Sequence, residues 1–239
     1  MFRKQHGDFQ WFPLVVQGNK VSVRLICKGK NGLLIVKSAE GMFRFDTRNH
    51  TYERLNALHE VAGNIFQMAS DADGMLWVSI WYDRERGFVH YDPYQDKVLH
   101  AFGAEERGIS NTDLNDIYPD GENVWMATNS SGLCRYVIRE DRFYCYPANA
   151  GVPGSLWSNQ LSRITKDRFG IDLSDFVGEA VAVSIFSDLG QLVWENRIPA
   201  VADLNISVSL REAGATAGMY TVRVQRNAGV ISKRLLLVE

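Results

Sequence analysis

The sequence predicts an all-β protein in two parts, an incomplete β-propeller followed by a small C-terminal Ig-like β-sandwich. A turn signal followed by a short apolar strand recurs within the first 150 residues, at Asn31–Ile35, Asp73–Trp77 and Asp120–Trp125. A glycine and then an aromatic residue follow each copy, and both recur with a period of about 45 residues. Beyond residue 170 aromatic residues become rare, and apolar and polar residues alternate. The period is typical of a propeller, whereas the alternation is typical of an antiparallel sandwich.

The propeller part is expected over residues 1–170, as repeats near 20–62, 63–108 and 109–155 and a truncated repeat at 156–170. Each repeat supplies short strands joined by turns, and Asp-Gly pairs such as the one at 73–74 provide the positive φ that a hairpin turn needs. We expect Trp77 and Trp125 to pack between neighbouring blades, where one large ring buries much area. About three and a half blades do not close a ring, so a flank with exposed apolar surface and strand edges is expected at each end.

Trp81 and Tyr82 are candidates for ligand contact. They follow the Trp77 strand in the longest connection of the three repeats, before Gly87. Loops at one face of a rigid β scaffold are where ligands commonly bind. The alternative is that these two rings only cover the blade beneath them.

Composition and motifs exclude several classes of function. The chain carries 26 Lys and Arg against 28 Asp and Glu, for a net charge of −2, which argues against nucleic acid as a partner. No apolar run approaches the length of a membrane span. No zinc-type histidine spacing, nucleophile elbow or phosphate-binding loop occurs. We therefore expect no catalytic residue, no cofactor, no metal site and no enzymatic activity in this chain.

The three cysteines, Cys27, Cys134 and Cys145, match no metal spacing. Buried free thiols are the favoured interpretation. A disulfide between Cys134 and Cys145 is the alternative, since their separation of 11 residues fits a hairpin.

The repeats resemble the two-component regulator propeller repeat. The third copy matches best, through Asp120-Gly121, Val124 to Thr128 and Gly132 to Tyr136. The first copy is degenerate, with Ile35 in place of the tryptophan. A fourth copy begins near Leu156 and stops at Gly170, where its own Leu-Trp strand should follow.

The tail, residues 171–239, resembles the C-terminal sorting domain of type IX secretion substrates in Bacteroidetes. The resemblance rests on three segments in the family's order, Val183 to Val193, Ala217 to Val224 and Lys233 to Val238. The chain departs from the family at one point, since the usual Pro-Asn-Pro-like opening is absent. Candidate residues of the sorting motif are Asp188, Gly190, Gly218, Tyr220 and Lys233. We expect the glycines at turns, Tyr220 in the core and Lys233 on an exposed face.

These resemblances imply a non-enzymatic binding or sensing module that is secreted or held at the outer-membrane surface. Its implied partner is the type IX secretion translocon, with a glycan or lipopolysaccharide as a possible ligand. One alternative is a component of the secretion machinery that engages lipopolysaccharide, and another is a fragment of a glycan-active propeller enzyme. The start of the sequence lacks the features of a signal peptide, so we expect the chain to be the C-terminal part of a longer protein.

Overall fold

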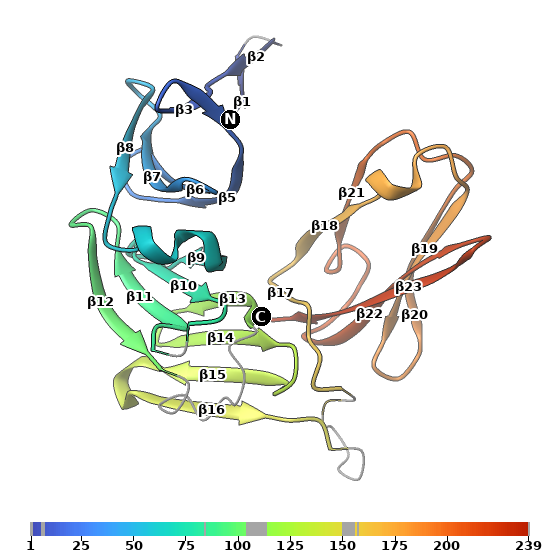
Figure 1. Cartoon of the computed structure of the whole chain (residues 1–239). Helices are drawn as coiled ribbons and strands as arrows, with labels where there is room; N and C mark the ends of the chain where they lie inside the picture. Colours follow the sequence, from blue (N-terminus) through green and yellow to red (C-terminus); the bar gives the residue numbers. More distant parts are fainter. Residues whose placement is uncertain are drawn as a thin grey trace. The chain divides into compact units, whose positions relative to one another are not determined.

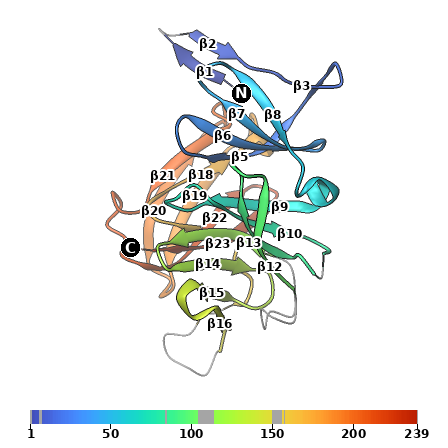
Figure 2. The same cartoon turned by 90° about the vertical axis from the view of Figure 1, so that its left-hand side faces the viewer.

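The structure, a computed structural model, describes residues 2–5, 8–83, 85–103, 114–149, 156 and 158–238. Nearly all regular structure in this part of the chain is β-strand, with three short 3-10 helices, so the predicted all-β class is confirmed. Contacts between Cα atoms divide the chain into two compact units, residues 1–124 with 136–143 and residues 125–135 with 144–239. The ribbon is shown in two views (Figures 1 and 2).

Three four-stranded antiparallel sheets follow one another along the chain, each with its strands in sequence order, as the propeller repeats predict. The first contains β5 (Val23–Lys28), β6 (Leu33–Ser38), β7 (Gly41–Asp46) and β8 (Thr51–Leu55). The 3-10 helix η1 (His59–Asn64) joins it to the second, which contains β9 (Ile65–Ser70), β10 (Leu76–Ile80), β11 (Phe88–Asp92) and β12 (Lys97–Phe102). The third contains β13 (Leu114–Asp120), β14 (Asn123–Thr128), β15 (Leu133–Val137) and β16 (Arg142–Tyr146), with η2 (Ile138–Glu140) between the last two.

Two short hairpins precede these sheets. They pair β1 (Phe2–Gln5) with β2 (Asp8–Trp11), and β3 (Leu14–Val16) with β4 (Asn19–Val21). Leu14 is buried with Val36 and Phe43, so the second hairpin covers one face of the first sheet.

The opposite face of the first sheet packs on the second sheet. Ile35 and Met42 of the first sheet share one apolar cluster with Val78, Val89 and other residues of the second. Alternate residues of a strand point to opposite faces, so a residue two places after Ile35 points to this same junction. Because β10 is covered on both faces, all five of its residues are buried.

Trp77 is buried as its place in the repeat predicts, with 1% of its surface exposed. Its ring centroid is 5.3 Å from that of Phe88 on the next strand and 5.6 Å from that of Tyr136 on β15. Packing between blades is therefore confirmed for this tryptophan. Trp125, at the same repeat position, is only partly buried and lies against Tyr146 and the Arg135 guanidinium.

The repeat also fixes a corner after the third strand of each sheet. The Tyr91 hydroxyl donates to Asp96 at 2.6 Å, and the Tyr136 hydroxyl donates to Asp141 at 2.7 Å. Both aspartates adopt positive φ, as does His50 at the same place in the first repeat. Asp96 also accepts hydrogen bonds from the backbone N–H groups of residues 56 and 57, which ties the second sheet to the end of β8.

The C-terminal part forms the predicted sandwich. One sheet has the order β17-β23-β22-β19-β20, and β18 pairs with β21 in a separate two-stranded sheet. The strands are β17 (Arg163–Thr165), β18 (Arg168–Asp172), β19 (Val181–Ser187), β20 (Leu192–Ile198), β21 (Asn205–Ser209), β22 (Gly218–Arg226) and β23 (Gly229–Leu237), with η3 (Ser174–Phe176) after β18. Both sheets contribute to one apolar core that includes Phe169, Ile185 and Leu235.

The expected border near Gly170 falls inside β18. Residues 163–165, which the sequence assigns to a truncated fourth repeat, form β17 and pair in parallel with Leu235–Leu237 of β23. Several residues of the expected fourth repeat, including Trp157, lie outside the described residues.

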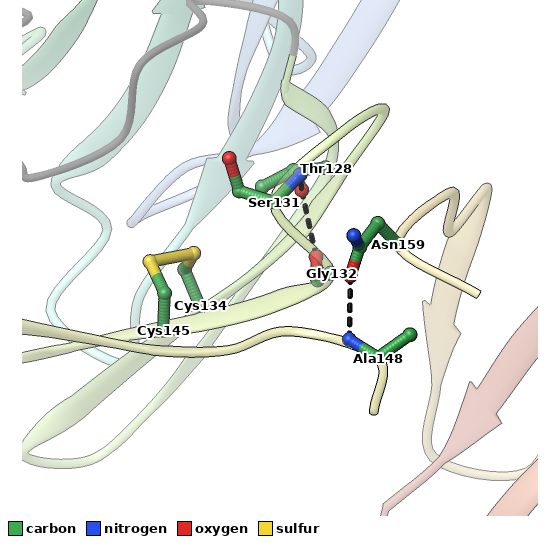
Figure 3. The surroundings of a disulfide bond; sticks show 7 residues. All are labelled: Thr128, Ser131, Gly132, Cys134, Cys145, Ala148 and Asn159. Atoms are coloured by element: carbon green, nitrogen blue, oxygen red, sulfur yellow. Dashed lines mark hydrogen bonds between the residues drawn. A yellow bond between two sulfur atoms is a disulfide. The ribbon is translucent and has the colours of Figure 1, made fainter. Parts of the chain in front are cut away.

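One sequence-based expectation is wrong for two of the three cysteines. Cys134 and Cys145 form a disulfide, because the antiparallel pairing of β15 and β16 brings their Cα atoms to 4.1 Å (Figure 3). The turn beside the disulfide is closed by the Thr128 hydroxyl, which donates to the Gly132 carbonyl at 2.8 Å. Cys27 is a buried free thiol, as expected.

Candidate functional site

The first unit contains a cavity of about 310 Å³ beside the Trp81 loop. Its volume is at the lower end of the range for small-molecule sites. The lining residues come from β5, β6, the end of η1 with the start of β9, and the loop after β10; they are Arg24, Leu25, Lys37, Gly63, Asn64, Ile65, Phe66, Trp81 and Tyr82. Both predicted ligand-contact residues, Trp81 and Tyr82, are therefore at one cavity.

The aromatic side of the cavity is a stacked pair with a third ring beside it. The rings of Phe66 and Trp81 are nearly parallel, at 13°, with centroids 3.7 Å apart. The Tyr82 ring meets the Trp81 ring edge-on at 6.1 Å and is 81% exposed. An exposed tyrosine beside a supported indole offers apolar ring faces to a ligand at little cost in side-chain entropy.

The loop that presents these rings is held by its own hydrogen bonds. The backbone N–H of Trp81 donates to the Asn64 carbonyl at 2.9 Å. The Asp83 carboxylate accepts from the backbone N–H groups of Glu85 and Arg86, at 3.0 and 2.8 Å, and pairs with the Arg86 guanidinium at 3.0 Å. Tyr82 adopts φ of 62°, which costs a non-glycine residue about 1–3 kcal/mol. The surrounding bonds thus hold an exposed ring in a strained conformation, a feature that clusters at ligand sites.

The cationic side of the cavity is formed by Lys37 and Arg24. Lys37, the next-to-last residue of β6, is only 3% exposed and lies on the face that packs on the second sheet. In the described part of the chain, neither Lys37 nor Arg24 has a carboxylate within ion-pair distance. Burial, and then the charge of Arg24, lower the pKa of Lys37 below its usual value. The stem of Lys37 is covered, but its Nζ atom is not fully buried, so the ammonium faces the cavity that the residue lines. A cation in this partly desolvated position without a counter-ion is costly, so it needs an explanation beyond folding.

Lys37 also breaks the repeat. Strand pairing aligns Lys37 with Ser79 in the second sheet, and the sequence repeat, counted from Trp77 and Trp125, aligns it with Ala127 in the third. Both of these residues are small and fully buried. Where two repeats place a small residue, the first places a long cation that lines a cavity. A local departure from the pattern of a fold is expected at functional positions.

The five sorting-motif candidates divide among different places in the second unit. Asp188, Gly190 and Tyr220 line a cavity of about 340 Å³, to which Arg223 and Arg234 also contribute. Gly190 sits in the turn between β19 and β20 with φ of 77°, which only glycine adopts readily.

Tyr220 and Lys233 lie where they are expected, whereas Gly218 lies in a strand rather than in a turn. Tyr220 is 6% exposed in the sandwich core, and its hydroxyl donates to the Thr216 carbonyl at 2.7 Å. Lys233 is exposed, as expected, and lines a different cavity of about 410 Å³. Gly218 begins β22 opposite Leu237 and lines neither cavity. Their role in sorting stays a prediction.

Several residues of these sites were not identified from the sequence. Lys37, Arg24 and Phe66 complete the first cavity, while Arg223 and Arg234 complete the second. Only Lys37 carried a usable signal, because it stands at a small-residue position of the repeat. The others reach their sites through strand pairing, which the sequence pattern does not specify residue by residue.

Residues 165–238 match the family of secretion system C-terminal sorting domains. The recognition of a sorting domain at this end of the chain is thus confirmed, and the match covers β18 to β23. A domain of this kind marks a protein that is secreted or attached to the cell surface and that interacts with a secretion system. Among the described residues, no helix is long and apolar enough to cross a membrane.

Solved structures with a similar arrangement come from several kinds of protein. The extracellular domain of the hybrid two-component system BT3049 of Bacteroides thetaiotaomicron is 13% identical with a TM-score of 0.40, over 98% of this chain and 47% of that one. PorZ, a surface component of the type IX secretion system of Porphyromonas gingivalis, is 11% identical with a TM-score of 0.35, over 100% and 48%. Virginiamycin B lyase of Staphylococcus aureus is 11% identical with a TM-score of 0.48, over 97% and 74%.

This chain therefore spans less than half the length of the first two of these proteins. No curated protein matches the sequence at a significant level.

Proposed function

We propose that this chain is a non-enzymatic binding module that is exported by type IX secretion through its C-terminal sandwich and acts at the cell surface or in the medium. The observation that carries the proposal is the match of residues 165–238 to a secretion sorting domain, together with the folded sandwich that these residues form. The cavity beside Trp81 supports the binding role, since it joins exposed aromatic rings with unpaired cations in the described part of the chain.

The disulfide between Cys134 and Cys145 independently supports export. Structural disulfides form and persist in oxidising compartments such as the periplasm and the cell exterior, and they are rare in the cytosol. This evidence for export is independent of the sorting domain, because the two cysteines belong to β15 and β16, which precede that domain.

Export is tested with the full chain carrying an added export leader in a bacterium with a working type IX system. We expect the protein at the cell surface or in the medium, and we expect it to stay in the periplasm of the same strain when the translocon is inactivated. A chain without residues 165–238 should also stay in the periplasm. Secretion without the translocon, or retention of the full chain in the working strain, would contradict the proposal.

Point variants separate recognition from folding. Asp188→Ala changes an exposed lining residue of the 340 Å³ cavity, and Asp203→Ala changes an exposed aspartate of the same unit that does not line it. Equal thermal stability with reduced secretion of the first variant alone is the expected result. Equal secretion of both variants would remove Asp188 from the recognised surface.

A further inference from the structure

We propose that the cavity beside Trp81 binds a small ring-bearing anion, with its acidic group at Lys37 and its ring against Trp81 and Tyr82. The proposal rests on the binding role proposed above and names the chemical class of the ligand. It also assigns Lys37, rather than the aromatic loop alone, as the residue that sets the charge of that ligand.

The charge of the cavity argues for an anion. Lys37 and Arg24 line it, and the lining residues of the described chain include no carboxylate. Lys37 is almost fully buried and lacks a counter-ion among the described residues. A ligand carboxylate, sulfate or phosphate would supply the missing charge and accept the hydrogen bonds that the ammonium can donate.

The aromatic side argues for a ring. Phe66 supports the Trp81 ring at 3.7 Å, and the strained, exposed Tyr82 stands next to it. The negative faces of such rings attract the C–H groups of a sugar or the edge of another aromatic ring. A cavity of about 310 Å³ accommodates one such ring and not an extended chain.

The positions of the cation and the aromatic rings, and their absence from the other repeats, support the same class of ligand. Lys37 lies next to the end of β6 on the face toward the second sheet, whereas Trp81 and Tyr82 follow the end of β10. The ligand would therefore touch both the first and the second four-stranded sheet. The equivalent positions in the other two repeats, Ser79 and Ala127, offer no cation, so the site is specific to the first repeat.

The test is isothermal titration calorimetry of the full chain with two matched pairs of probes. Galacturonate and galactose differ in the acidic group on a sugar ring, and benzoate and benzamide differ in the acidic group on an aromatic ring. We expect at least one acid to bind at least ten-fold more tightly than its neutral partner. Which acid binds identifies the source of the ring, an acidic sugar or an aryl acid.

Variants locate the binding. Lys37→Met removes the charge and keeps the length, and it should weaken binding of the acid at least ten-fold without lowering the melting temperature. Lys28→Met removes an exposed lysine of β5 outside the cavity and should change the affinity less than two-fold. Tyr82→Gly removes the ring and relieves the positive φ, so weaker binding with equal or higher stability is expected.

Three results would overturn the proposal: no binding of either acid, equal binding of acid and neutral partner, or unchanged binding by Lys37→Met. If a neutral partner bound as tightly as its acid, the proposed binding role would stand, but the ligand would belong to another chemical class. None of these results bears on export, which the secretion assay with the inactivated translocon tests separately.

Discussion

Reduction of the Cys134–Cys145 disulfide is expected to lower the free energy of unfolding by about 2.8 kcal/mol. The two cysteines are 11 residues apart. In the chain-entropy treatment, closing a loop of that size removes about 9 cal/mol/K from the unfolded chain, which gives this value at 25 °C. For a cooperative unit of 150–250 residues the melting temperature should fall by about 6–11 °C.

The assay is thermal and urea unfolding of the oxidised and reduced chain, with thiol alkylation and mass spectrometry to count free cysteines. The oxidised protein should show one reactive cysteine after unfolding, and the reduced protein three. Cys27→Ala is the control. Its thiol is buried, donates to the Met68 carbonyl at 3.1 Å and has a pKa raised by burial to about 12, so removing it should leave the effect of the reductant intact.

The reasoning is refuted if the oxidised and reduced chains unfold within about 0.5 kcal/mol of each other while the thiol counts differ, since the loop entropy would then have no effect on stability. A count of three free thiols in protein recovered from the cell exterior would instead contradict the disulfide itself. The paired variant Cys134→Ser with Cys145→Ser should match the reduced protein in both assays.

Further predictions concern packing, protonation and the extent of the sandwich. Trp77→Ala should destabilise by about 3–5 kcal/mol, and Trp125→Ala, half-buried, by less than about 2 kcal/mol; equal losses by urea unfolding would refute the packing argument. Burial raises the pKa of Asp96, but its three hydrogen bonds lower it more, so the net pKa lies below 3.8. Asp96→Asn should therefore cost about 1–3 kcal/mol at pH 7, and the difference should shrink as unfolding is measured below pH ~4; a constant difference would contradict this. A fragment of residues 158–238 should be more stable to proteolysis than one of residues 173–238, which lacks β17 and β18, and the reverse order would argue against their place in the sandwich.

Most of the architecture follows from periodic features that a single sequence contains. The recurring turn, apolar strand and aromatic residue predict three four-stranded sheets, because each feature has a fixed place in a blade. Ile35 and Trp77 stand at the same position and face the same kind of junction, and the buried environment of each is as the repeat predicts. The sandwich can be predicted equally well from the sequence, since period-two alternation requires one covered and one open face of each sheet.

The rest depends on distances between strands that the pattern does not contain. The spacing of Cys134 and Cys145 allows a hairpin, but whether the thiols face each other depends on the register of β15 and β16. The cavity beside Trp81 was also predictable only in part. Trp81 and Tyr82 could be identified from their long aromatic loop, whereas Arg24 and Phe66 join them only when the first two sheets pack together. Lys37 is an intermediate case, because alignment of the repeats marks it as unusual without saying what surrounds it.

Two features with different physical origins lead to the same compartment. The sorting domain is a folded signal that a secretion system reads, and the disulfide is a covalent product of an oxidising environment. The disulfide stabilises a hairpin of the third sheet, while the sorting domain begins after it, so neither feature requires the other for its own stability. A protein that remained in a reducing compartment would lose the stabilisation by Cys134–Cys145 and would have no use for the sandwich as a signal. Export explains both, and it places the exposed Tyr82 ring and the cations beside it where ligands from outside the cell can reach them.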